Sequence, residues 1–391
     1  MIPYGKHHID DTDIQAVVDV LRGGTLTQGR YIDLFEKIVA DYVGARFAVA
    51  VSSGTAALHL AMLAADVGPG DEVLTSPITF VASANAAIYV GAKAIFADID
   101  SQTINISPLS IKQQLEKHRR IKAIVPVHFA GLPCDMLAIK NLADNSGATV
   151  IEDAAHALGA SYLDGGRVGC CKHSLMTMFS FHPVKTIAAG EGGMITTNDE
   201  SIYRKLLRLR SHGVNKLDDT FLLPDQASDG QGDNPWYYEM QELGFHYRIT
   251  DIQSGLAASQ MKRLDAFLSH RKSLAKRYDF EFSDSLLISS AQLVDKSNSG
   301  NHIYPVRINF KELGKTRREV MIELRNKNIG SQVHYIPVPM HPFYQQMGFK
   351  PEDYPEAMLY YTEALTLPLF FELSFEQQEF IITTLKGILN K

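Results

Sequence analysis

The sequence predicts an α/β protein with two domains: a large one built on a mostly parallel mixed sheet, and a smaller C-terminal α/β domain. Over the first 250 residues, short apolar runs alternate with segments in which apolar residues recur at helical spacing. This alternation is typical of parallel strands connected by helices on both faces of a sheet. A chain of 391 residues also exceeds one ordinary domain. We expect the large domain at residues 1–255, and a long connecting helix with the small domain at residues 256–391.

The expected elements of the large domain follow in order. Apolar residues spaced from Ile14 to Leu21 and from Ile32 to Tyr42 predict two helices, and the first of them could pack on the small domain. The run FAVAV predicts a buried strand, and a helix follows it to about Ala65. Further strands are predicted at 71–76, 92–98, 121–127, 148–153, 175–181 and 193–198. Helices are predicted at 79–90, 107–118 and 134–145.

The second half of the chain begins with a break in this rhythm. Residues 215–240 are polar and contain the only tryptophan, Trp236, which predicts an exposed loop. A long helical stretch is predicted at 250–280. In the small domain, HIYPVRINF predicts a strand and TRREVMIELRNKN a helix.

Composition excludes several classes of protein. Apolar residues make up 45% and charged residues 21%, which is the balance of a soluble globular protein. A net charge of −6 argues against nucleic-acid binding as the main role. Three cysteines form no disulfide framework or zinc ligand set, and no apolar stretch reaches the ~20 residues that cross a bilayer. We expect a cytoplasmic enzyme without a metal site and without nucleic-acid or membrane partners.

The strongest chemical signal is the segment SFHPVKT with GEGGM, which follows VIEDAAH along the chain. Lys185 lies in a loop between two strands, where an ordinary lysine would be exposed to solvent. Asp153 ends an apolar strand at the carboxyl edge of the sheet, where ligands bind, although it could simply cap a helix. A lysine that forms a Schiff base and an aspartate that pairs with a pyridinium nitrogen are the two groups that pyridoxal phosphate (PLP) requires.

Three further signals support a cofactor site. The SSGT segment lies between a strand and a helix, so it can bind a phosphate or serve as a plain N-cap. Phe80 follows a strand end and is either a core residue or a ring that stacks on a planar cofactor. His156 could contact the phenolate oxygen of the cofactor or cap a helix. The sequence has no GxGxxG after a strand and no GxxxxGK[ST], which disfavours dehydrogenases and NTPases.

The chain resembles the DegT/DnrJ/EryC1/StrS aminotransferases from Ile2 to about Leu385. The resemblance rests on SSGTAALHLAMLA, SPITFVASANA, VIEDAAHALGA, FSFHPVKT with GEGGMITTND, RSHG and LGFHYRITDIQ. These enzymes are PLP-dependent transferases of fold type I that aminate keto groups on nucleotide-linked sugars. The resemblance implies a homodimer whose active sites are shared between the subunits.

The resemblance also implies individual roles. Lys185 corresponds to the Schiff-base lysine, Asp153 to the partner of the pyridine nitrogen, His156 to the contact of the ring oxygen, and Phe80 to the stacking ring. The implied phosphate contacts are Gly54, Thr55 and Ser180. In the motif that reaches the neighbouring subunit, His246 replaces the usual asparagine, and a histidine can still donate to a phosphate.

The expected reaction transfers an amino group from L-glutamate to the C4 ketone of a UDP-linked 2-acetamido-2,6-dideoxy-hexos-4-ulose. Within the family, the N-terminal segment and VHYIPVPMHPFY resemble members that act in pseudaminic acid biosynthesis. Thr27, His334 and Tyr335 lie in these segments and are candidate substrate contacts, or ordinary packing residues. Alternatives are a D-configured UDP-4-keto sugar of the bacillosamine or legionaminic type, a nucleotide-cofactor oxidoreductase, and a non-catalytic protein that binds PLP or a nucleotide sugar.

Overall fold

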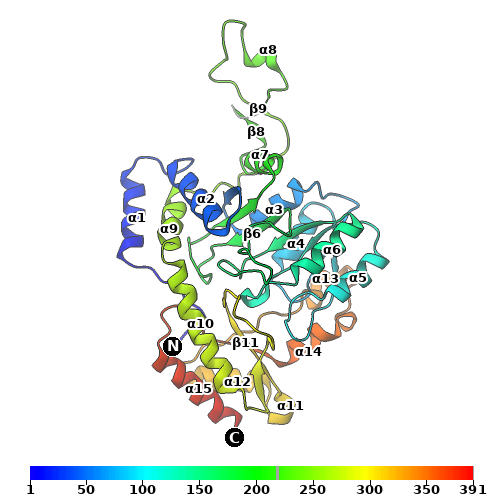
Figure 1. Ribbon diagram of the computed structural model, residues 1–391, viewed down its shortest axis with the longest axis vertical. Coiled ribbons are helices and arrows are strands. Elements are labelled where there is room, and N and C mark those ends of the chain that lie inside the picture. Colours follow the sequence, from blue (N-terminus) through cyan, green and yellow to red (C-terminus); the bar gives the residue numbers. More distant parts are fainter. Residues whose placement is uncertain (217–219, 391) are drawn as a thin grey trace.

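A computed structural model describes residues 1–216 and 220–390 and shows a central seven-stranded sheet (Figure 1). The strands are β1 (Phe47–Val51), β2 (Glu72–Thr75), β3 (Lys93–Phe96), β4 (Ile121–Val125), β5 (Thr149–Asp153), β6 (Met176–Ser180) and β7 (Gly193–Thr197). Their order is β1-β7-β6-β5-β4-β2-β3. In this sheet β7 runs antiparallel to the other six strands, which are parallel to one another. The predicted mostly parallel mixed sheet is confirmed.

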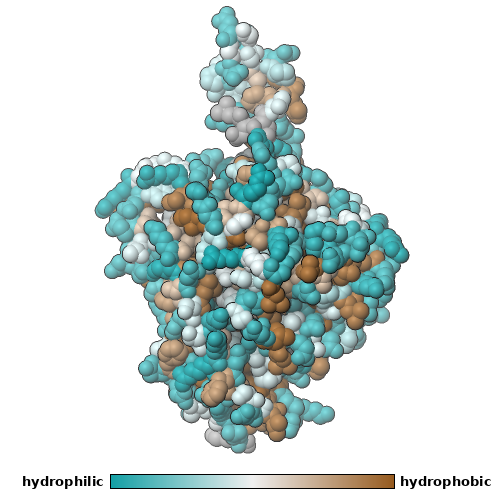
Figure 2. Space-filling model, viewed as in Figure 1, coloured by the Kyte–Doolittle hydropathy of each residue, from teal (hydrophilic) through white to brown (hydrophobic). Residues whose placement is uncertain are grey.

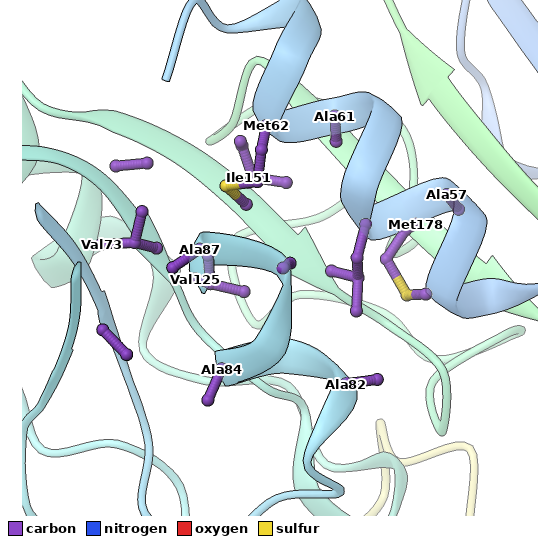
Figure 3. Close-up of a cluster of buried hydrophobic side chains, with 14 of the residues drawn as sticks. Ala57, Ala61, Met62, Val73, Ala82, Ala84, Ala87, Val125, Ile151 and Met178 are labelled. Carbon is purple, nitrogen blue, oxygen red and sulfur yellow. The ribbon is translucent and has the colours of Figure 1, made fainter. Parts of the chain in front are cut away.

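Helices cover both faces of this sheet, because neighbouring residues of a strand point to opposite sides. Val49 and Val51 join one buried cluster, whereas Ala48 and Ala50 join the other. The first cluster includes residues of α3 (Gly54–Ala64), α4 (Ala82–Tyr89) and α7 (Glu200–Leu209). The second includes residues of α2 (Arg30–Val43), α5 (Pro108–Lys117), α6 (Met136–Ser146) and α9 (Asp251–Met261). Figure 3 shows side chains of α3 and α4 over the strands in the first cluster.

The predicted helix at 250–280 is two helices, α9 and α10 (Leu264–Phe282). Arg263 separates them with φ −111° and ψ 3°, outside the helical range. Its guanidinium forms ion pairs with Asp10 and Asp13 at the start of α1 (Asp11–Arg22), which packs against α9. The break between the two helices therefore lies where Arg263 binds the N-terminal end of α1. No glycine or proline in the sequence indicates a break there.

The C-terminal part has its own buried cluster, which begins at Leu274, whereas Ala257 and Phe267 still belong to a cluster of the large sheet. A three-stranded antiparallel sheet consists of β10 (Ile288–Ser290), β11 (Tyr304–Ile308) and β12 (Ala364–Leu367). The second half of α10 packs on it together with α12 (Arg317–Asn326) and α15 (Phe375–Leu389). The short helices here are α11 (Phe310–Leu313), α13 (Pro342–Gln346) and α14 (Pro355–Glu363). Ile2 pairs with Ile329, so the N-terminus also reaches this part.

An arm projects from the body at the predicted exposed loop (Figure 1). It contains β8 (Val214–Asn215), α8 (Pro224–Ala227) and β9 (Glu239–Met240), and residues 217–219 of the predicted loop lie outside the described residues. Trp236 is 73% exposed on this arm. Figure 2 shows apolar and polar residues side by side on the projection. Across the described residues, no helix has the length and hydropathy that a membrane crossing requires.

Candidate active site

A cavity of about 810 Å³ lies at the carboxyl-terminal edge of the large sheet. Segments that follow β1, β2, β4, β5 and β6 line it, and residues from the C-terminal part close over it. Parallel strands bring their carboxyl ends to the same edge, so motifs far apart in the sequence meet there. Most predicted site residues line this cavity: Gly54, Thr55, Phe80, Asp153, His156, Ser180, Lys185, His334 and Tyr335.

Asp153 is the last residue of β5 and its carboxylate is buried. The Ser83 hydroxyl donates to Oδ2 over 2.6 Å, and the Ala155 amide donates to Oδ1 over 3.1 Å. Residues 154–160 form turns without a helix, so the alternative that Asp153 caps a helix is wrong. Each carboxylate oxygen has one donor and can accept a further hydrogen bond from a cationic ligand.

A second acidic residue, Glu152, precedes Asp153 and faces the opposite side of β5, since successive strand residues alternate. Its carboxylate is fully buried and accepts from His128 Nε2, the Tyr162 hydroxyl and the Ser174 hydroxyl. Hydrogen bonds to the charged form favour ionisation, and the pKa of Glu152 is lowered although burial alone would raise it. This satisfied network anchors the end of β5, and with it the position of Asp153.

Lys185 lies in the loop after β6, partly buried in the cavity wall, so the alternative of an exposed surface lysine is wrong. Burial lowers the pKa of its amine to about 8, and the negative charge of Asp153 opposes that shift. An amine with such a pKa exists in both protonation states near neutral pH. It can act as a nucleophile and as a proton carrier.

The N-terminus of α3 forms one end of the cavity. Ser53 is its N-cap and accepts from the amide of Ala56 over 3.1 Å, so the plain capping reading is correct. The amides of Gly54 and Thr55 donate to no acceptor among the described residues. A Cβ on Gly54 would lie 2.9 Å from Cβ of Ser180, so only glycine lets this turn approach β6 so closely. Free amides at a helix N-terminus bind anions, and both functions coexist here.

Phe80 is 60% exposed at the cavity, so the alternative that it belongs to the core is wrong. Its ring centroid lies 6.4 Å from that of Tyr335, which belongs to the C-terminal part of the chain. An exposed ring that lines a cavity has a free face on which a planar ligand can stack.

His156 lies in a turn after β5 and is buried. Nε2 of its ring lies 3.0 Å from the Tyr335 hydroxyl, whereas Nδ1 has no hydrogen-bond partner in the described part of the chain. Burial, with further contributions from Lys185 and His334, lowers the pKa of His156 well below its usual value. Burial also lowers the pKa of His334 to about 3. Both imidazoles are therefore neutral near pH 7.

The polar groups of the cavity fit PLP. A ring nitrogen needs an acidic partner, an aldehyde needs an amine, and a phosphate needs donors. Asp153, Lys185 and the free amides of Gly54 and Thr55 are these groups, and they share one cavity. Nδ1 of His156 is a buried polar atom without a hydrogen-bond partner among the described residues, so it is free to bond to a ligand in the cavity.

Two predicted residues lie outside this cavity. Thr27 is exposed, forms a backbone bridge with Thr250 and does not line the cavity of its own chain. His246 is also exposed, and its ring lies 5.3 Å from that of His212. That position agrees with the expectation that His246 serves a neighbouring subunit, which remains a proposal.

Ser83, His302 and Tyr4 are among the residues of the cavity wall that no sequence pattern singled out. Ser83 bonds to Asp153, and its signal was its place three residues after Phe80 in the same motif. His302 precedes β11 in a stretch read only as a strand. Tyr4 enters because the N-terminal segment lies along the C-terminal part, and no local pattern announces that contact.

The comparisons with known proteins agree with this chemistry. The model of the DegT/DnrJ/EryC1/StrS aminotransferase family matches residues 7–386. The chain is 40% identical to the spore coat polysaccharide biosynthesis protein SpsC of Bacillus subtilis, over 99% of this chain and 97% of that protein. It is 35% identical to the UDP-4-amino-4,6-dideoxy-N-acetyl-beta-L-altrosamine transaminase of Campylobacter jejuni, over 100% of this chain and 98% of that protein.

A solved structure shows the same similarity. PseC of Helicobacter pylori, an aminotransferase involved in the biosynthesis of pseudoaminic acid, superposes on this chain with a TM-score of 0.88. The sequences are 30% identical, and the alignment covers 100% of this chain and 99% of that one.

Proposed function

The chain belongs to the DegT/DnrJ/EryC1/StrS aminotransferase family, and from this premise we propose that it transfers an amino group from L-glutamate to the C4 ketone of a UDP-linked 2-acetamido-2,6-dideoxy-hexos-4-ulose. Enzymes of this family depend on PLP and have the fold type I of PLP-dependent transferases. The chain is thus a PLP-dependent transaminase that acts on nucleotide sugars. The individual ketone, the amino donor and the residue roles are our proposal.

The observation that carries the proposal is the meeting of Lys185, Asp153 and the N-terminus of α3 in one cavity. Lys185 would hold the aldehyde carbon, Asp153 the ring nitrogen, and Gly54 and Thr55 with Ser180 the phosphate. Asp153 is buried, so a cationic ring nitrogen beside it keeps its proton. When bound, PLP supplies an electron sink for the carbanion at the amino-acid α-carbon.

The protein supplies the proton transfers. Lys185, with a pKa of about 8, takes the proton from the α-carbon of the amino donor and later returns a proton to the carbon that becomes the sugar C4–H. General acid–base catalysis of this kind contributes roughly 10²–10⁴ in rate. Ser83 and the Ala155 amide hold the Asp153 carboxylate in place during both halves of the reaction.

Two relatives support the L-configured substrate of pseudaminic acid biosynthesis. They are the Campylobacter jejuni transaminase and PseC. The Bacillus subtilis protein has a higher identity, and its name refers to spore coat polysaccharide biosynthesis without specifying a sugar. A D-configured UDP-4-keto sugar is therefore the second candidate. The two ketones differ in ring stereochemistry, which moves the C4 carbonyl within the cavity. A displacement of about 1 Å can cost roughly 10² in rate.

We also propose that the active species is a cytoplasmic homodimer with shared sites. His246 is exposed and outside its own cavity, which supports a contact with the phosphate of a neighbouring subunit.

The test offers purified enzyme, L-glutamate and PLP with the L-arabino ketone and, separately, the D-xylo ketone, and identifies the amino sugars by NMR. We expect the L-arabino ketone to give the 4-amino-L-altrose product with the higher kcat/KM. A strong preference for the D-xylo ketone moves the protein to the bacillosamine or legionaminic type. Lys185→Ala serves as the blank, and no amino sugar from either ketone would overturn this substrate class.

A further inference from the structure

We propose that Tyr335 is a positioning residue that holds His156 in one orientation with its proton on Nδ1. The inference rests on the proposed function, because it concerns the histidine of the same cofactor site. It goes beyond the expected role of Tyr335 as a substrate contact. The observation behind it is the 3.0 Å separation between the Tyr335 hydroxyl and Nε2 of His156.

The segment that carries Tyr335 is firmly anchored. The amide of Gln332 donates to the carbonyl of Thr366 over 3.2 Å, and the amide of Thr366 donates to the carbonyl of Gln332 over 2.7 Å. The next side chain, His334, bonds through Nδ1 to the Thr366 hydroxyl over 2.9 Å, and the Tyr360 hydroxyl donates to the His334 carbonyl over 2.7 Å. Tyr335 is therefore presented to His156 by a braced segment of the C-terminal part.

The ring of His156 has two close ring neighbours, Tyr335 and His302. The Tyr335 ring lies nearly parallel to it, with centroids 6.0 Å apart and an angle of 20° between the planes. The ring centroid of His302 lies 4.5 Å from that of His156, with an angle of 41° between the two planes. Rotation of the imidazole would break the hydrogen bond to Tyr335 and is opposed by both rings.

The hydrogen-bond inventory assigns the proton. A neutral imidazole has one nitrogen that donates and one that accepts. Burial raises the pKa of Tyr335, so its hydroxyl keeps its hydrogen. Among the described residues, the hydrogen-bond partner of this hydroxyl is Nε2 of His156. A buried hydroxyl donates where it can, so Tyr335 donates to Nε2 and the ring proton resides on Nδ1.

Other groups around His156 favour the same neutral form. They are Asp153 on β5, Lys185 in the loop after β6, His302 before β11, and His334 and Tyr335 in the segment from the C-terminal part. A protonated His156 would repel Lys185, and burial penalises its charge further. The donated hydrogen bond from Tyr335 adds to this preference, because it needs the lone pair that protonation of Nε2 would remove.

The test is an NMR titration of the apoenzyme with ¹⁵N-labelled histidine. The His156 resonance is assigned by its loss in His156→Gln. We expect wild-type His156 to show its proton on Nδ1 and to stay neutral well below pH 6.5. In Tyr335→Phe, we expect its pKa to rise by about one pH unit, because a hydrogen bond to the neutral form is lost, and a second tautomer to appear.

The matched control is Tyr344→Phe. Tyr344 also belongs to the C-terminal part, and its hydroxyl bonds to Oδ1 of Asn85 over 2.6 Å, outside the cavity. This variant should leave the His156 titration unchanged. In the holoenzymes, the pH at which the absorption of bound PLP changes should shift in Tyr335→Phe only.

A proton on Nε2 in the wild-type apoenzyme overturns the proposal without any variant, even if Tyr335→Phe fails to fold. An unchanged tautomer and titration in a folded Tyr335→Phe overturns it too, as does an equal shift in Tyr344→Phe. The apoenzyme measurement uses neither sugar nor amino donor. Failure of the proposed substrate therefore leaves this test intact.

Discussion

The hydroxyl of Ser83, in the first turn of α4, donates a 2.6 Å hydrogen bond to Oδ2 of Asp153 at the end of β5. Thr79 lies 2.8 Å from the same hydroxyl, so the serine is itself oriented. This contact turns the carboxylate toward the cavity, where the ring nitrogen of PLP is proposed to bind. The segment SPITFVASANA thus contributes two side chains to the site: the ring of Phe80, and the hydroxyl of Ser83 that holds the carboxylate of Asp153.

Removing the acid should weaken both cofactor binding and turnover. In Asp153→Ala, the cationic ring nitrogen loses its counter-charge in a buried site, which costs roughly 3–5 kcal/mol. Asp153→Asn should be nearly as poor, because an amide does not keep that nitrogen cationic. Titration of the apoenzymes with PLP and steady-state kinetics measure both effects. An asparagine variant with unchanged kcat and affinity would show that the negative charge has no role.

Ser83→Ala should have a smaller effect in the same direction. The amide of Ala155 still bonds to Asp153, so only one donor is lost. A hydrogen bond to a charged group contributes about 1.5–3 kcal/mol, and we expect PLP affinity to fall roughly tenfold or more. Ser201→Ala, in an exposed cap of α7, is the control and should bind PLP as the wild type does. Equal affinities of all three proteins would contradict the role of Ser83.

Lys185→Ala should abolish turnover and leave the fold intact. The side chain lies in a cavity wall, so its removal leaves the packed clusters on the two sheet faces untouched. Loss of the proton carrier alone costs roughly 10²–10⁴ in rate. Amino-sugar formation and a circular dichroism melt measure the two properties. Amination at a rate near that of the wild type would refute the assignment of this lysine.

Lys185 also makes a pH-dependent contribution to stability. Its folded pKa of about 8 lies below the ordinary 10.5, so between these values the unfolded chain binds more protons than the folded one. The cost of burying the charged amine is fully present below pH 8 and is relieved as the pH rises to 10.5. Lys185→Met should therefore be more stable than the wild-type apoenzyme at neutral pH, by a few kcal/mol at most.

Urea unfolding of the two apoenzymes at several pH values tests this prediction. The difference in the free energy of unfolding should shrink between pH 8 and 10.5, because the other titrating groups are common to both proteins. A difference that is constant over this range, or that grows with pH, would contradict the lowered pKa of Lys185.

Sharing of active sites can be tested by complementation. Lys185→Ala and His246→Ala subunits should each be poorly active alone, because each site lacks one group. Randomly mixed and refolded, half of the dimers pair the two variants and contain one intact site, so about a quarter of wild-type activity should return. Sedimentation at assay concentration complements the kinetics. A fully active monomer, or no recovery on mixing, would refute the role of His246.

Much of the site could be predicted from the sequence because parallel strands impose a common geometry. Asp153 ends one apolar run, SSGT follows another, and the Lys185 loop follows a third. Once these runs form parallel strands, their carboxyl ends meet at one edge, so three distant motifs become one cavity. The alternatives for Phe80 and Lys185 were harder to separate, because exposure inside a cavity and exposure at a surface have the same local pattern.

The sequence by itself determined the α/β class, the mixed sheet, the family and nine of the residues that line the cofactor cavity. Only the tertiary structure decided that Ser83 orients Asp153, that Tyr335 reaches His156 across 179 residues of sequence, and that Arg263 separates α9 from α10. The physical reason is that periodicity reports which faces are buried along one segment. A contact between side chains depends on how the C-terminal part docks over the sheet edge, and that is settled only when both parts are folded.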